Sequence, residues 1–204
     1  MKELIVDYLP FEVKPEQISE SMKQNNGKLV VRGVLQRAEA KNQNGRVYPR
    51  EILMREAKKY TKEFVNEKRA MGELDHPESS VVNLQNVSHN ITEMHWEGDN
   101  LLGTVEILTT PSGNILRELF KSNIKLGISS RGMGSVETVS EGPAAGAQKV
   151  GNDFELIAFD FVSNPSTHGA FLHPIKESVE KVVGRTCGDY CKVESVINDI
   201  MRGS

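Results

Sequence analysis

The stretch IKLGISSRGMGSVETV, residues 124–139, decides how the chain is interpreted, because it combines a strand pattern with a cluster of small and polar residues. Apolar residues alternate along its first half, as in a β-strand, although the glycines loosen it. Alternation places Ser129 and Arg131 on one face, and Ser130 with Ile128 on an opposite face that is typical of a core. If either serine is a nucleophile, this pattern favours Ser129, with Ser130 as the alternative. Otherwise the stretch is a glycine-rich bend with hydrogen-bonded serines.

A second stretch, DFELIAFDFVSNP at residues 153–165, is the most apolar strand pattern in the chain. Asp160 lies among its apolar residues, so we expect a buried carboxylate, which is costly unless it is paired. A histidine is one suitable partner, as in the third member of a catalytic triad. An ion pair with Arg131 or with a lysine is the structural alternative.

The other patterns predict a mainly β core with a few helices, closer to an α+β or barrel-like fold than to βαβ units. Asn-Gly at residues 44–45 predicts a turn with positive φ. The predicted strands cover 28–40, 86–96 and 101–108. The predicted helices cover 50–70 and 112–123, the second with Ser112 as a possible cap. Residues 1–27 are expected to form an arm or an irregular segment.

The segment GELDHP, residues 72–77, carries a histidine that is a candidate general base. Pro77 biases His76 toward an extended conformation, and the pKa of an imidazole suits proton transfer near neutral pH. The alternative is a loop histidine that is hydrogen-bonded to the backbone. Asp75 is a competing acid for orienting His76, although adjacent residues of an extended chain point apart.

Composition excludes several other classes of protein. The net charge is −3, which gives no basic excess for nucleic acid, and no apolar run approaches the 18 residues that a membrane span needs. The N-terminal residues lack the unbroken apolar stretch of a signal peptide. Cys187 and Cys191 are the only cysteines, which fits two free thiols in a reducing cytoplasm. His89 and His95 would lie about 20 Å apart on one strand, too far for one ion, so we expect no metal site.

Four blocks of this sequence resemble a known family. MGELDHP at 71–77, GISSRGMGS at 127–135 and FDFVSNPS at 159–166 look like the three motif blocks of the prohead core proteases of tailed bacteriophages, which are capsid-maturation serine proteases of the myovirus type. NGRVYPREIL at 44–53 is similar to that family's Asn-x-Arg-x-Tyr-Pro segment. The order and spacing of the four blocks make the resemblance specific. It covers roughly residues 28–175.

The resemblance implies an α+β, mainly β fold, with a β-barrel core like that of herpesvirus assemblin and helices around it. It implies that His76 is the base, Ser129 the nucleophile and Asp160 the acidic third member, a position at which the herpesvirus enzymes use a second histidine. Arg131 and the backbone amides near Gly132 are candidates for stabilising an oxyanion or orienting the substrate. No metal or organic cofactor is implied.

The resemblance also suggests the biological setting. The expected substrates are the scaffold or core proteins of the phage prohead and the major capsid protein, inside a prohead in the host bacterial cytoplasm, and we expect a homo-oligomer. The alternative is an inactive prohead scaffold protein with the same fold. An esterase or a metal enzyme would be more distant alternatives.

Self-cleavage is a further hypothesis, because proteases of this kind often cut after glutamate in an Ile/Leu-x-Glu context. Two such tripeptides end at Glu20 and Glu177. A cut at either position is expected to remove an appendage without touching the core. The corresponding division is an N-terminal arm over 1–27, a serine protease domain over 28–175 and a C-terminal tail over 176–204.

Overall fold

The computed structural model describes residues 2–11, 13–75, 77, 79–140 and 146–163. All of the described residues belong to one compact unit of the chain, Met1–Gly169. His76, Glu177 and both cysteines lie outside the described residues, as does the tail predicted over 176–204.

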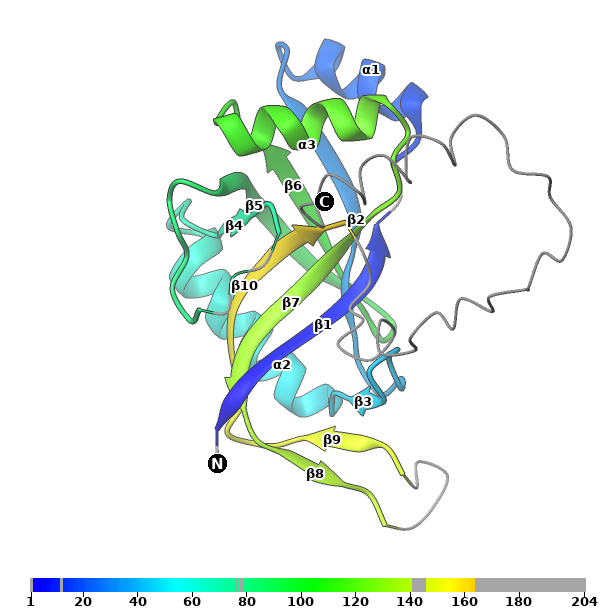
Figure 1. Cartoon of the computed structure of the whole chain (residues 1–204), viewed down its shortest axis with the longest axis vertical. Helices are drawn as coiled ribbons and strands as arrows, with labels where there is room; N and C mark the ends of the chain where they lie inside the picture. Colours follow the sequence, from blue (N-terminus) through cyan, green and yellow to red (C-terminus); the bar gives the residue numbers. More distant parts are fainter. Residues whose placement is uncertain (1, 12, 76, 78, 141–145, 164–204) are drawn as a thin grey trace, which may run out of the picture. The chain divides into compact units, whose positions relative to one another are not determined.

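A three-stranded antiparallel sheet carries the glycine- and serine-rich stretch at its centre (Figure 1). Its order is β1-β7-β10, with bounds Glu3–Phe11, Leu126–Gly134 and Glu155–Val162. β7 is buried along almost its whole length because a strand lies on each side of it. A bulge interrupts the pairing of β10 with β7 between Leu156 and Ala158.

A four-stranded sheet and a small three-stranded sheet complete the β structure. The larger has the order β2-β6-β5-β4, with bounds Leu29–Arg37, Asn100–Ile107, Val87–Glu97 and Met71–Glu73. The smaller has the order β3-β9-β8, with bounds Arg46–Val47, Gln148–Val150 and Val136–Thr138. A single parallel bridge joins Leu74, just after β4, to Phe161 of β10. The described strands thus form three sheets, and no ladder closes them into one barrel.

Helices flank these sheets, with bounds Pro15–Gln24 for α1, Arg50–Tyr60 for α2 and Pro111–Lys121 for α3. The chain continues from α2 directly into a π-helical turn, η1, at Thr61–Val65. α2 begins directly after Pro49, as the sequence predicted. α3 is capped by Thr110, whose hydroxyl accepts from the Gly113 amide, and not by Ser112. None of the described helices is both long and apolar enough to cross a membrane.

The predicted strands and helices of the central part are confirmed, but residues 1–27 are more ordered than an irregular segment. They contain β1 and α1, and β1 pairs with β7 from Glu3 to Phe11. Ile5 and Phe11 are buried in the core. Pro10 obscured the strand pattern in the sequence, and it is tolerated here because β1 is an edge strand.

Candidate active site

Ser129 lies in the middle of β7, opposite Tyr8 on β1 and Asp160 on β10. Its side chain is buried with 1% of its surface exposed, and its Oγ has no hydrogen-bond partner among the described residues. Buried polar atoms almost always have a partner, so an isolated hydroxyl indicates a functional position. Because residues opposite one another share a face, Ser129 and Asp160 lie on the same side of the sheet.

Ser130 points to the other side of the sheet, as strand alternation predicted. Its Oγ accepts a hydrogen bond from Gln36 Nε2 at 2.7 Å and donates to the Asp7 carbonyl at 3.3 Å. The hydroxyl of Ser130 is therefore part of a structural hydrogen-bond network, whereas that of Ser129 is not. This contrast favours Ser129 over Ser130 as the nucleophile.

Arg131 binds two buried carboxylates beside Ser129. Its Nε donates to Asp160 Oδ2 at 2.8 Å, and its Nη2 donates to Asp160 Oδ1 at 3.2 Å and to Glu73 Oε1 at 3.1 Å. All three side chains are 0% exposed. The planar fork of arginine suits this two-point binding of a carboxylate, so the trio forms one rigid buried unit.

The ion pair between Asp160 and Arg131 is the structural alternative that the sequence left open, and it is present. Burial raises the pKa of Asp160, while Arg131 and the Glu73 amide oppose this shift because they bind the charged form. Oδ1 accepts from Arg131 and from the Glu73 amide, but Oδ2 accepts only from Arg131 among the described residues. A carboxylate oxygen can accept more than one hydrogen bond, so Oδ2 has the capacity for a donor in addition to Arg131.

Arg131 and the backbone amides near Gly132 are the predicted groups for stabilising an oxyanion or orienting the substrate, and both residues also have structural contacts. Each guanidinium nitrogen of Arg131 already donates, the last of them from Nη1 to the Ser79 carbonyl at 2.6 Å. Gly132 lies inside the sheet between Ile5 and Leu156. A Cβ at Gly132 would come within 2.4 Å of the Phe154 ring, so close packing explains the glycine.

Glu73 is a further buried carboxylate of the site, and the sequence analysis gave it no catalytic role. One of its oxygens, Oε1, binds Arg131 and also accepts from the Asn83 amide at 3.0 Å. The other, Oε2, is buried without a hydrogen-bond partner in the described part of the chain. The signal in the sequence was an acid three residues before His76, in the same block. Through Glu73 and the Ser79 carbonyl, the loop that follows the histidine is tied to β7.

The backbone just before His76 is held against β10, next to the residue that lies opposite Ser129. His76 itself lies outside the described residues. The Asp75 amide donates to the Phe161 carbonyl at 2.7 Å, and Phe161 directly follows Asp160. Asp75 has a left-handed φ of 64°, which aspartate adopts more readily than most residues. Its side chain is exposed, whereas Asp160 is buried beside Ser129, so burial favours Asp160 over Asp75 as the acid of the site.

His89, a second histidine near β10, has a structural role. Its Nδ1 lies 2.9 Å from Ser88 Oγ and its Nε2 lies 2.9 Å from the Phe159 carbonyl, so both ring nitrogens are occupied. Burial lowers its pKa to about 4, which keeps the ring neutral near pH 7. His95 is exposed on the same strand, and the described residues hold no group of three metal-ligating side chains.

Replacing His89 with glutamine is expected to flatten the pH dependence of stability between about pH 6.5 and 4. The pKa of His89 falls from 6.5 to about 4 on folding, so as the pH drops the unfolded chain binds the proton first. The wild type should therefore lose up to about 3 kcal/mol over this window, and keep that stability above it. Urea denaturation in steps of pH measures the difference. Equal losses in wild type and variant would contradict this assignment.

The chain is similar to known proteins over most of its length. Residues 4–180 match the family model described as "Prohead core protein serine protease". The prohead core protein protease of Enterobacteria phage T4 is 33% identical over 157 residues, covering 74% of this chain and 71% of the relative. A solved structure of the bacteriophage T4 capsid assembly protease superposes with a TM-score of 0.69 at 27% identity, covering 80% of this chain and 99% of that one.

Proposed function

The chain belongs to the prohead core protein serine protease family, and on this premise we propose that it is a serine endopeptidase that acts in the phage prohead. The observation that carries the proposal is the buried Ser129 hydroxyl without a hydrogen-bond partner among the described residues. It lies opposite the buried carboxylate of Asp160, and the chain that enters His76 is tied to the neighbouring residue Phe161.

The proposed mechanism is acyl transfer. Ser129 Oγ attacks the peptide carbonyl while His76 takes its proton, and the same proton passes to the leaving amine. Water then attacks the acyl-enzyme with His76 again as the base, which releases the carboxylic acid and restores the serine. Asp160 orients and stabilises the imidazolium through Oδ2, while Arg131 holds that carboxylate in place and favours its charged form.

The proposed substrates are the scaffold or core proteins of the prohead and the major capsid protein. This assignment rests on the relatives, which are named a prohead core protein protease and a capsid assembly protease. The proposed location is the interior of the prohead in the host bacterial cytoplasm, and the proposed assembly is a homo-oligomer. An inactive scaffold protein with the same fold remains the alternative function.

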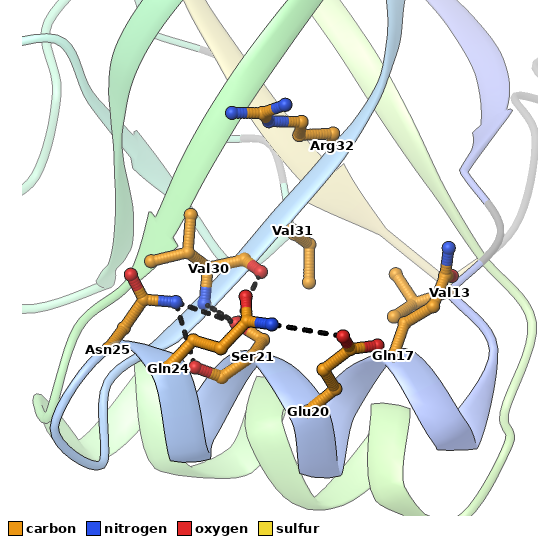
Figure 2. Close-up of a pocket in the computed structure, with 9 residues that line it drawn as sticks. All are labelled: Val13, Gln17, Glu20, Ser21, Gln24, Asn25, Val30, Val31 and Arg32. Carbon is orange, nitrogen blue, oxygen red and sulfur yellow. Dashed lines mark hydrogen bonds between the residues drawn. The ribbon is translucent and has the colours of Figure 1, made fainter.

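Self-cleavage remains part of the proposal at Glu177, but the expectation for Glu20 needs correction. Glu20 lies within α1, and the next residue, Ser21, binds both backbone groups of Val30 on β2 at 2.7 and 2.9 Å (Figure 2). A cut after Glu20 would divide α1 and separate β1 from the rest of the chain. It would therefore affect the core, because β1 is a strand of the central sheet.

Labelling with a fluorophosphonate tests the proposed nucleophile. We expect one adduct on Ser129, lost in Ser129→Ala and slowed by about 100-fold or more in His76→Ala, because an unassisted hydroxyl is a weak nucleophile. Ser130→Ala should still carry the adduct on Ser129. Intact mass and peptide mapping measure these outcomes. Cleavage of a glutamate-containing peptide should be lost in Ser129→Ala and in His76→Ala.

Three results would contradict the proposal. An adduct on Ser130 would overturn the choice of nucleophile. Peptide cleavage that survives in Ser129→Ala would overturn the mechanism, and cleavage absent from the wild type with native prohead substrates would favour the inactive scaffold. The same intact-mass spectra would reveal a cut at Glu20 or Glu177 as a fixed mass loss that the Ser129→Ala chain does not show.

A further inference from the structure

The block NGRVYP, residues 44–49, takes no part in the site described above, yet its polar side chains converge on one carboxylate. Asp7 Oδ1 accepts from Asn44 Nδ2 at 2.7 Å and from Arg46 Nη1 at 3.0 Å. Asp7 Oδ2 accepts from the Tyr48 hydroxyl at 2.5 Å. We call these four residues the Asp7 clamp. It joins the turn before α2 to β1, about 40 residues earlier in the sequence.

The clamp satisfies a charge that would otherwise destabilise the fold. Asp7 is 1% exposed, and a buried carboxylate is tolerated only with a compensating charge and hydrogen bonds. Arg46 supplies the charge, while Asn44 and Tyr48 supply further donors. Burial and the Asp7 carboxylate raise the pKa of Tyr48 well above its usual range, so its hydroxyl keeps the proton that it donates. Asn44 and Arg46 also bind the Val6 carbonyl, which fixes the backbone of β1 as well.

The clamped strand lies directly beside the candidate nucleophile. Asp7 is opposite Ser130, and Tyr8 is opposite Ser129. The Asp7 carbonyl accepts from the Ser130 hydroxyl. The Tyr8 ring lies against Gly127, where an added Cβ would be only 1.4 Å from Tyr8 Cε2. Gly127 and Ser129 share a face, so Tyr8 forms one wall beside the Ser129 side chain.

We propose that Asp7 is a positioning residue of the active site, through which Asn44, Arg46 and Tyr48 lock β1 onto β7 and thereby hold Ser129 and its Tyr8 wall in the reactive geometry. The inference rests on the proposed function, since it requires Ser129 to be the nucleophile. It gives the NGRVYP block a task in catalysis without contact with substrate. It also makes β1 a part of the catalytic unit, whereas the sequence predicted an arm.

The test compares full-length Asp7→Asn and Tyr48→Phe with Glu3→Gln, which removes an exposed carboxylate from the same strand. The readouts are thermal unfolding, the rate of fluorophosphonate labelling at Ser129, and kcat and KM on a glutamate-containing peptide. At a temperature where each chain is folded, Asp7→Asn should label about 10-fold or more slowly, because small displacements of reacting groups have large effects on rate. Tyr48→Phe should show a smaller loss in the same direction, and Glu3→Gln should match the wild type.

The positioning role predicts a lower kcat with KM changed less than about twofold, because the clamp touches no substrate. Folded Asp7→Asn and Tyr48→Phe chains that label at the wild-type rate would overturn it and leave the clamp as a purely structural feature. If Asp7→Asn does not fold, Tyr48→Phe decides alone. A wild type that reacts no faster than Ser129→Ala would instead overturn the proposed function, so the two failures are distinguishable.

Discussion

Arg131→Met should lower the free energy of unfolding by about 3–5 kcal/mol, because it leaves two buried carboxylates without their cation. Asp160 and Glu73 are both 0% exposed, and Arg131 makes three hydrogen bonds to them. A methionine side chain roughly fills the volume of the arginine but donates no hydrogen bond to either carboxylate. Urea or thermal denaturation at neutral pH measures the loss. Labelling of Ser129 should also fall by at least about 100-fold, because the carboxylate opposite the nucleophile would no longer be fixed.

Two further variants separate this effect from the loss of any positive charge. Lys2→Met breaks an ion pair with Glu155 near the same sheet, but both side chains there are about half exposed, at 44% and 56%. That change should leave the free energy of unfolding close to the wild-type value, because solvent screens an exposed pair. Arg131→Lys keeps the charge but loses the planar fork, so its stability should lie between wild type and Arg131→Met.

The pH dependence gives an internal check on Arg131→Met. Without the guanidinium, burial acts unopposed by Arg131 on Asp160 and raises the pKa of this carboxyl further. Folding of the variant is therefore favoured as the pH falls and Asp160 binds a proton, so the deficit in unfolding free energy relative to wild type should shrink as the pH falls. A deficit below about 1 kcal/mol at neutral pH, with native secondary structure, would show that the buried ion pairs are not needed.

Strand periodicity was sufficient to predict the faces of β7, because side-chain alternation is a local property of an extended chain. It placed Ser129 with Arg131 and Ser130 with the opposite face, and the hydrogen bonds of the structure agree. The charge of Asp160 among apolar residues likewise predicted burial and pairing. These inferences needed no knowledge of which segments come together.

The partners of these residues were harder to predict, because they depend on contacts between distant segments. The choice between an arginine and a histidine for Asp160 depends on which loops reach β10, and Glu73 joins the network only because β4 ends beside that strand. β1 was missed for a related reason. Asp7 occupies a buried position of this strand, and a charged residue there breaks the apolar pattern. Its burial is understandable only once the partners that bind its carboxylate are known.

Gly72→Ala is expected to be strongly damaging although it adds only one methyl group. A Cβ on Gly72 would lie 1.9 Å from the Phe159 carbonyl oxygen and 2.4 Å from the His89 ring. A backbone carbonyl within a sheet cannot rotate away, so β4 would have to move off β10. The move would break the hydrogen bonds from the Glu73 and Asp75 amides to Asp160 and Phe161.

The expected loss is about 3 kcal/mol or more in unfolding free energy, from overpacking and from the two hydrogen bonds. Labelling of Ser129 should fall by about 100-fold or more, because the displaced backbone leads directly into His76. Gly98→Ala is the matched control. Gly98 has a φ of 57° and no atom within 4 Å of an added Cβ, so alanine there costs only the left-handed backbone, about 1–2 kcal/mol, and should leave labelling unchanged. If Gly72→Ala is no less stable and no less reactive than Gly98→Ala, then close contact between β4 and β10 is not what places the histidine segment beside the serine strand.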